Sequence, residues 1–229
     1  MAIQTQGFGG TVAEVETNTR AIRTILRPTD IGAQGAFRKA MRNSGALTSL
    51  AAGLTAGATI FTFRWAPATT SLLALIKRVQ MSATIGLTAF AAGIGQFEGY
   101  VARTFSANDT GGITGTVTTN NAKLRTAFAT TANATGQIQI ANTGQVTAGT
   151  RTLDTDPFFT HTFGISTVTC TQVLLPTTMY EQTSILWPLI LANQEGFVIN
   201  GTMPATGTWN FTVSVDWEEV SSFGSATLT

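Results

Sequence analysis

Charged side chains are scarce in this chain. Only 11% of its 229 residues are Asp, Glu, Lys or Arg, whereas an ordinary soluble domain carries about a quarter. Threonine supplies much of the polar surface instead, with 43 residues against 13 Lys plus Arg. Because Thr is β-branched and forms hydrogen bonds without a charge, this composition favours an all-β protein whose outer faces are partly covered by other subunits.

Cysteine and histidine are nearly absent. The single cysteine, Cys170, excludes an intrachain disulfide, so the fold does not depend on an oxidising compartment. The single histidine, His161, excludes a multi-histidine metal site within one chain. No Gly-x-Ser-x-Gly nucleophile elbow and no Lys-bearing phosphate loop occurs. We therefore expect no catalytic residue, no metal site and no cofactor, which means a protein that is not an enzyme.

The remaining acidic residues give no stronger indication of a site. Asp154 and Asp156 are a fragment of a calcium loop, and the pattern is more typical of a turn before Pro157. Glu218 and Glu219 end the last apolar alternation, where we expect both of them to be solvated. Neither pair forms a constellation that supports catalysis.

Targeting and membrane signals are also missing. The first ten residues lack a basic segment followed by an apolar one, so we expect no secretory signal. Residues 44–63 are uncharged and long enough to span a bilayer. Thr and Ser interrupt them repeatedly, and their last part alternates as a strand does, which favours a loop followed by a strand. We expect no membrane partner.

Alternating apolar residues predict strands along most of the chain. The clearest alternation places Trp209, Phe211, Val213, Val215 and Trp217 on one face. Further strands are expected at 58–66, 72–85, 96–106, 136–142, 161–169, 171–178 and 187–202, the last folding back at 193–196. About eight strands with long connections predict a jelly-roll or Greek-key β-sandwich over residues 44–229. In that fold the 209–217 strand pairs with an early strand at the centre of a sheet.

Positive charge gathers in residues 1–43. Only Asp30 opposes the six cations of residues 20–42. We expect an N-terminal basic arm, extended or weakly helical, in which Pro28 ends a first helix and Asp30 caps a second one. Its predicted contact residues, toward a capsid or a neighbouring subunit, are Arg20, Arg23, Arg27, Phe37, Arg38, Lys39 and Arg42. Few aromatic residues accompany these cations, so protein contact is favoured over nucleic acid, and we expect no nucleic-acid partner.

Several blocks of the sequence resemble those of a known group of proteins. The blocks are "IFTFRWAPATTSLLALIKRVQMSATI" (60–85), "SANDTGG" (106–112), "TAGTRTLDTDPF" (147–158) and "PLILANQEGFVINGTMPATGTWNFTVSVDWEEV" (188–220). They look like those of uncharacterised proteins that recur in tailed-phage genomes and prophages. The resemblance covers most of residues 44–229 and none of residues 1–43.

This resemblance implies a structural protein of the virion, namely a capsid decoration or cement protein with a jelly-roll body. It further implies that the chain binds the major capsid protein on the outer capsid surface and associates with itself as a homotrimer. No functional residue carries over from the group.

Two other functions stay open on the sequence alone. A head- or tail-fibre module would recognise a host glycan or receptor, with Trp187 or Tyr180 stacking on sugar rings. An enzyme would be a cupin-like metalloprotein or a hydrolase built around His161, and the residue inventory argues against it.

Overall fold

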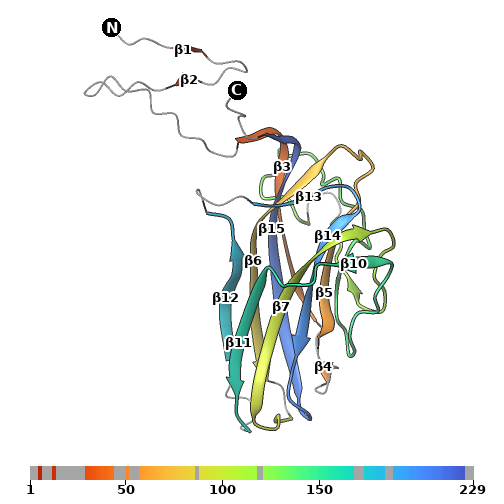
Figure 1. Cartoon of the computed structure of the whole chain (residues 1–229), viewed down its shortest axis with the longest axis vertical. Coiled ribbons are helices and arrows are strands. Elements are labelled where there is room, and N and C mark those ends of the chain that lie inside the picture. Colours follow the sequence, from red (N-terminus) through yellow and green to blue (C-terminus); the bar gives the residue numbers. More distant parts are fainter. Residues whose placement is uncertain are drawn as a thin grey trace, which may run out of the picture.

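The computed structural model describes residues 5–6, 12–13, 29–43, 50–51, 57–85, 88–117, 121–167, 173–183 and 188–224. These described residues form strands and no helix, and the protein is an all-β sandwich (Figure 1). Short strands β1 (Thr5–Gln6) and β2 (Val12–Ala13) pair only with each other. The remaining strands form two antiparallel sheets, as the composition and the alternation predict.

The two sheets have seven and six strands. The first sheet holds four long strands, β5 (Ala58–Trp65), β7 (Gly93–Phe105), β11 (Phe159–Ile165) and β14 (Glu195–Thr202), and three short ones, β8 (Ile113–Thr114), β9 (Ile138–Ile140) and β10 (Arg151–Leu153). The second sheet holds β3 (Thr29–Arg42), β6 (Leu73–Ile85), β12 (Val173–Glu181) and β15 (Thr208–Gly224), with the short strands β4 (Leu50–Ala51) and β13 (Leu189–Leu191).

The long strands follow the order of a jelly roll. They run β11-β7-β14-β5 in the first sheet and β12-β6-β15-β3 in the second. Successive long strands therefore alternate between the sheets, except that β7 and β11 are neighbours in the first sheet. This arrangement is the one that two nested Greek keys produce. The turn expected at 193–196 lies between β13 and β14. It crosses from one sheet to the other, because β13 pairs with β6 whereas β14 pairs with β5 and β7.

Strand β15 confirms the prediction made for residues 209–217. It lies between β3 and β6, at the centre of the second sheet. All five of its alternating apolar side chains are at most 1% exposed, and the polar residues between them are partly exposed. On the inner face, the ring of Phe63 lies 5.5 Å from that of Phe197 and 5.3 Å from that of Trp217. The Phe63–Trp217 contact joins the two sheets, and the Phe63–Phe197 contact lies within the first sheet, so that the three rings form the middle of the core.

Strand β3 contradicts the helix expected between Asp30 and residue 42. β3 pairs with β15 from Thr29↔Gly224 to Arg42↔Thr212 and belongs to the sandwich. The boundary between residues 43 and 44 therefore does not separate an arm from the body. Phe37 and Met41 are four residues apart, which fits the period of a helix as well as that of a strand. Pairing with β15 selects the strand, because it buries both side chains in the core.

The described residues between β7 and β11 (106–117 and 121–158), here called the β7–β11 connection, close one side of the sandwich. Its strand β9 pairs with β5 of the first sheet. It also reaches the second sheet, since the backbone N–H of Arg38 donates to the Ala122 carbonyl at 2.6 Å and that of Leu124 to the Ala36 carbonyl at 3.0 Å. The opposite side is bounded by β11 and β12, each the outermost strand of its sheet among the described residues (Figure 1).

Candidate contact surface

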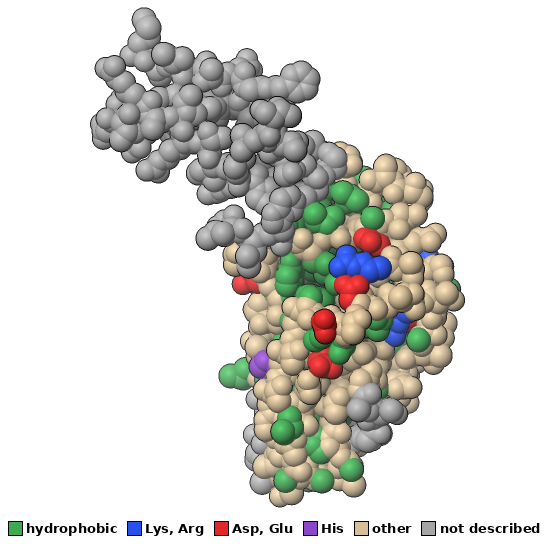
Figure 2. All heavy atoms as spheres, viewed as in Figure 1, with side chains coloured by type: hydrophobic (Ala, Val, Ile, Leu, Met, Phe, Trp, Pro, Cys, Tyr) green, Lys and Arg blue, Asp and Glu red, His purple; other side chains and the backbone are tan. Residues whose placement is uncertain are grey.

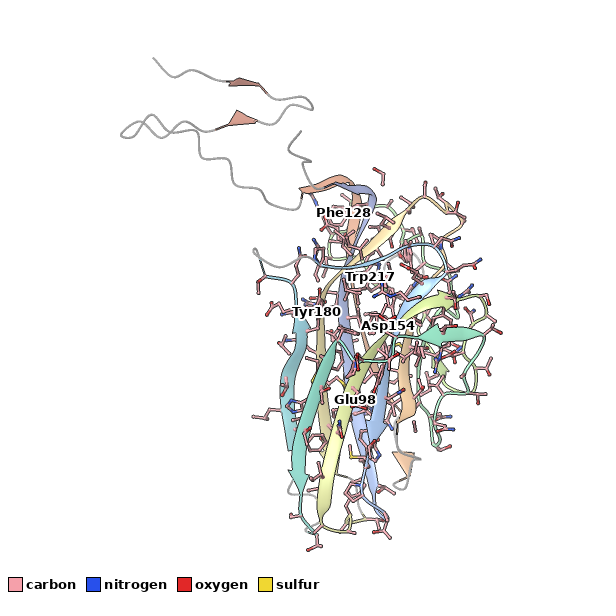
Figure 3. The ribbon with its side chains drawn as sticks, in the orientation of Figure 1. Glu98, Phe128, Asp154, Tyr180 and Trp217 are labelled. Carbon is pink, nitrogen blue, oxygen red and sulfur yellow. The ribbon has the colours of Figure 1, made fainter. Side chains whose placement is uncertain are left out.

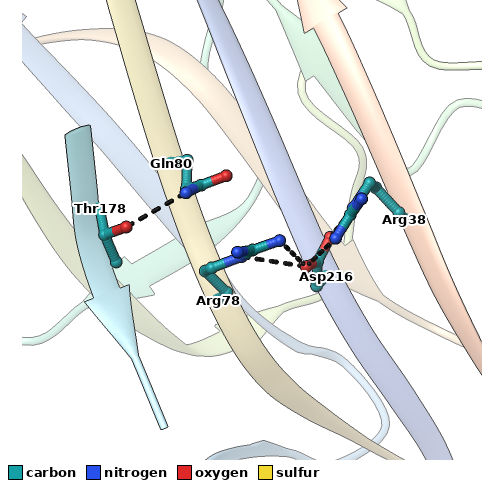
Figure 4. Close-up of polar contacts among 5 residues, drawn as sticks. All are labelled: Arg38, Arg78, Gln80, Thr178 and Asp216. Atoms are coloured by element: carbon teal, nitrogen blue, oxygen red, sulfur yellow. Dashed lines mark hydrogen bonds and ion pairs between the residues drawn. The ribbon is translucent and has the colours of Figure 1, made fainter. Parts of the chain in front are cut away.

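The outer face of the second sheet carries a cross-strand group of three charged side chains. Asp216 of β15 lies between Arg38 of β3 and Arg78 of β6, opposite both in the strand register (Figure 4). Arg38 donates to both carboxylate oxygens, with Nε 2.6 Å from Oδ1 and Nη2 2.9 Å from Oδ2. Arg78 donates to Oδ2 from Nε at 3.1 Å and from Nη2 at 2.8 Å. One carboxylate thus joins three strands.

This arrangement shifts the pKa values of Asp216 and Arg38. Burial of the Asp216 carboxyl opposes its ionisation, but the hydrogen bonds and charges of Arg38 and Arg78 outweigh that effect. The pKa of Asp216 therefore lies below its ordinary value. The hydrogen bond to Asp216 also raises the pKa of Arg38. Asp216 and Arg38 therefore stay charged over the physiological range.

Further polar and charged side chains lie near this group on the same face. Gln80 of β6 donates to Thr178 of β12 at 3.1 Å (Figure 4), and Lys77 forms an ion pair with Glu218 at 2.8 Å. Farther along the strands the face has a hollow of about 250 Å³. Its polar lining residues are Arg42, Ser82, Thr84, Asn210 and Thr212. The face is therefore polar, with ion pairs that lie within it.

The predicted arm residues are not equivalent in the structure. Arg38 and Arg42 lie on β3 with exposed side chains, and Lys39 is half-buried on the same strand. Phe37 is fully buried, so its side chain is not available for contact on the surface of this fold. Arg20, Arg23 and Arg27 lie outside the described residues. The structure therefore brings Arg38 and Arg42 to one face and places Phe37 in the core.

The outer face of the first sheet is acidic. Glu98, Asp154, Asp156 and Glu195 lie near Tyr100 and Arg103 on this side. Arg103 forms an ion pair with Asp154 at 2.8 Å, and burial together with a hydrogen bond to Glu98 raises the pKa of Tyr100. Figure 2 shows charged side chains gathered over the upper half of this face, and Figure 3 shows Asp154 and Glu98 along β7.

Glu219 is buried, whereas we expected both glutamates at the end of the last apolar alternation to be solvated. It is 1% exposed and accepts hydrogen bonds from the Thr131 hydroxyl, the Ala132 backbone N–H at 2.9 Å and the Trp217 indole N–H at 3.1 Å. Burial raises the pKa of Glu219, although these three donors oppose the shift. Since neighbouring residues of a strand face opposite sides, the Glu218–Glu219 pair itself was the signal that one of them points inward.

A second buried polar link fixes the start of the β7–β11 connection. The side chains of Arg151 and Asp109 form an ion pair and are 6% and 0% exposed. Asp109 also accepts from the Gly149 N–H at 2.7 Å, and Arg151 donates to the Thr59 hydroxyl at 2.7 Å. No short sequence motif links these residues, which lie 42 positions apart. The pair holds the connection against β5.

The residues considered for chemistry occupy structural positions. His161 lies on β11 opposite Phe97, with its ring 6.0 Å from that of Phe163. The Tyr180 hydroxyl accepts a hydrogen bond from the Leu189 N–H at 2.6 Å, and Trp187 lies outside the described residues. Among the residues that the structure describes, no three His, Cys, Asp or Glu side chains gather as metal ligands. That part of the chain also holds no helix of the length and apolarity needed to cross a membrane.

No model of a known protein family matches the chain, and no curated protein matches it either.

Proposed function

We propose that this chain is a virion structural protein, a capsid decoration or cement protein that binds the major capsid protein on the outer surface of the shell. The observation that carries the proposal is the outer face of the second sheet. On this face Arg38 and Arg78 each form an ion pair with Asp216, which lies on the strand between them. A partner can cover such a face without leaving one of these charges buried and unpaired, which is the costly case at a protein interface.

The segment that precedes β3 is the proposed anchor. Arg20, Arg23 and Arg27 lie within the nine residues before Thr29, where β3 begins. Thr29 pairs with Gly224, so this segment joins the sandwich beside the end of β15. The cations of this segment attract an acidic capsid surface, and many copies on one shell multiply a modest contact by avidity. A homotrimer fits the local three-fold axes of a shell.

Deletion of residues 1–28 tests the anchoring role directly. Because β3 is part of the second sheet, deletion of residues 1–43 would remove a core strand and confound the result. The shorter deletion retains β3, so we expect the sandwich to keep its thermal unfolding midpoint. We expect its occupancy on capsids that lack the protein to fall at least tenfold, as measured by co-sedimentation.

A charge variant distinguishes the effect of the cations on capsid binding from the effect of the segment's length. The triple substitution Arg20→Gln, Arg23→Gln and Arg27→Gln keeps all 229 residues. We expect it to weaken capsid binding and to make the remaining binding less sensitive to salt. Unchanged occupancy for both the deletion and the triple variant would rule out the anchor. Failure of the wild-type chain to bind capsids, together with saturable binding on a glycan array, would favour the receptor-binding alternative.

A further inference from the structure

Strand β11 leaves one edge of the first sheet unpaired among the described residues. It pairs with β7 over seven consecutive positions, from Phe159↔Gly99 to Ile165↔Gly93, without a bulge. Its other edge pairs with no described strand. The strand contains no Asp, Glu, Lys, Arg or Pro. A regular edge of this kind exposes backbone donors and acceptors that another strand can satisfy.

The other outer strands of the sandwich are protected. Strand β12 has two register shifts against β6 and carries Pro176, which cannot donate a backbone hydrogen bond. The outer edge of β3 is covered at residues 36–38, where Ala36 and Arg38 form backbone hydrogen bonds with Leu124 and Ala122 of the β7–β11 connection. Protection of this sort normally prevents association through sheet edges. Strand β11 has no bulge, no proline and no described strand on its outer edge, so this edge is open to a partner.

The first five residues of β11 are symmetric about His161. Residues 159–163 read Phe-Thr-His-Thr-Phe in both directions. The β7 residues opposite are symmetric at the positions that face inward, with Gly99 opposite Phe159, Phe97 opposite His161 and Gly95 opposite Phe163. The two aromatic rings cover the glycines and fill the space that a Cβ would occupy. An antiparallel copy of β11 would therefore meet the same side chains in the same order.

We propose that two copies of this chain pair through β11, antiparallel and about a two-fold axis that passes beside His161. The first sheet then continues from one copy into the other. Phe159 lies opposite Phe163 of the second copy, Thr160 opposite Thr162 of the second copy, and His161 opposite its own equivalent. A two-fold contact requires such a self-complementary patch. Because no side chain of β11 carries a carboxylate, an ammonium or a guanidinium group, the pairing brings none of these charges together.

Half-buried and exposed apolar side chains add to the contact. Phe159 and Phe163 are half-buried at the margin of the core. Leu175, on the neighbouring outer strand β12, is 70% exposed, and Ile94, next to β11 in the sheet, is 64% exposed. The overlap of residues 159–163 with their equivalents is only about 17 Å long. The association is therefore expected to depend on concentration, as contacts smaller than a standard interface do. The inference concerns two copies alone and does not depend on binding to a capsid.

A pair of charge variants tests the register. Thr160 and Thr162 are both exposed, so substitutions there leave the core intact. In the variant Thr160→Lys/Thr162→Lys, each introduced lysine faces a lysine of the second copy. In the matched variant Thr160→Lys/Thr162→Glu, each introduced lysine faces a glutamate. Because Glu98 lies opposite Thr160 in β7, its effect on a lysine introduced at that position is the same in both variants.

Sedimentation velocity of the full chain over a concentration series gives the readout. We expect the wild type and the Lys/Glu variant to show the two-fold association step, and the Lys/Lys variant to lose it or to weaken it at least tenfold. Wild-type behaviour of the Lys/Lys variant would overturn the proposal. Equal loss in both variants, or a wild type that shows no association step at any concentration, would overturn it as well.

Other contacts could also join copies of the chain. A cross-linking experiment therefore tests whether the two-fold axis lies beside His161. In a Cys170→Ser background, His161→Cys places two thiols opposite each other at the two-fold axis, close to the geometry of a disulfide. We expect a reducible dimer from this variant under mild oxidation. Thr104→Cys, exposed on β7 and away from β11, is the matched control and should give none. Equal cross-linking of the two variants contradicts the proposed axis.

Discussion

Phe37 stacks on Trp217, with ring centroids 5.4 Å apart and the ring planes 24° from parallel. The contact joins β3 to the centre of the second sheet, and both side chains are at most 1% exposed. It therefore assigns Phe37 to the core, whereas the sequence predicted a contact residue of the arm.

Phe37→Ala should lower the free energy of unfolding by about 3–5 kcal/mol, because it removes a buried aromatic ring and leaves a cavity. Equilibrium unfolding in urea measures this loss. The neighbouring substitution Arg38→Ala is the control, and its cost should stay near 1 kcal/mol because the Arg38 side chain is 46% exposed. Similar small losses for both variants contradict the core assignment.

Asp216→Asn should reduce stability at neutral pH by about 1–2 kcal/mol, since it removes two charge-assisted contacts on a partly exposed face. The folded-state pKa of Asp216 lies below its ordinary value of 3.8. Its stabilising contribution is therefore present above that value and is lost as the pH falls through the folded-state pKa.

Thermal unfolding of the wild type and the Asp216→Asn variant from pH 7 down to pH 2 checks this dependence. The two unfolding midpoints should converge at the acid end. Glu218→Gln, which alters the pair with Lys77 on the same face, should show a smaller difference at pH 7. A gap that stays constant down to pH 2 argues against the charge-pair explanation.

Glu219 should have the opposite pH dependence. Its pKa in the folded state is raised above its ordinary value of 4.5. A raised carboxyl pKa means that the folded state holds the proton more tightly than the unfolded state does. Stability from this group is therefore greatest below pH 4.5 and declines as the pH rises through the folded-state pKa.

Comparison of the wild type with Glu219→Gln between pH 4 and pH 7 isolates this contribution. The stability of the wild type relative to the variant should fall as the pH rises. At every pH the variant should be less stable by about 1–3 kcal/mol, because a glutamine amide cannot accept from all three donors. A difference that grows with pH is inconsistent with the raised pKa.

Ser214→Trp should block the proposed capsid contact. Ser214 lies on the outer face of β15, opposite Gln80 and Ala40 in the register. A bulky side chain there prevents close approach of a partner, whereas the core is untouched. We expect at least tenfold weaker capsid binding with the stability changed by about 0.5 kcal/mol or less.

The matched variant Thr104→Trp places the same side chain at an exposed position of the first sheet. It should bind capsids as the wild type does. Equal weakening by both variants, or by neither, removes the second-sheet face from consideration as the contact surface.

The sequence by itself determined the fold class and most of the strands. In residues 209–217 the alternation of large apolar and small polar side chains is compatible with one structure, a strand with one buried face, and β15 has that structure. The stretches at 58–66, 72–85 and 96–106 likewise became β5, β6 and β7. Such alternation is a local property, because successive side chains of any strand face opposite sides.

Tertiary structure decided the positions whose local pattern is ambiguous. The four-residue spacing of Phe37 and Met41 suits a helix or a strand, and pairing with β15 selected the strand. Continuing the alternation of residues 209–217 places Glu219 on the inward face, but only the β7–β11 connection supplies the donors that hold its carboxylate there. In both cases the deciding partners lie far away in the sequence, so their hydrogen bonds and buried contacts exist only once the two sheets have come together.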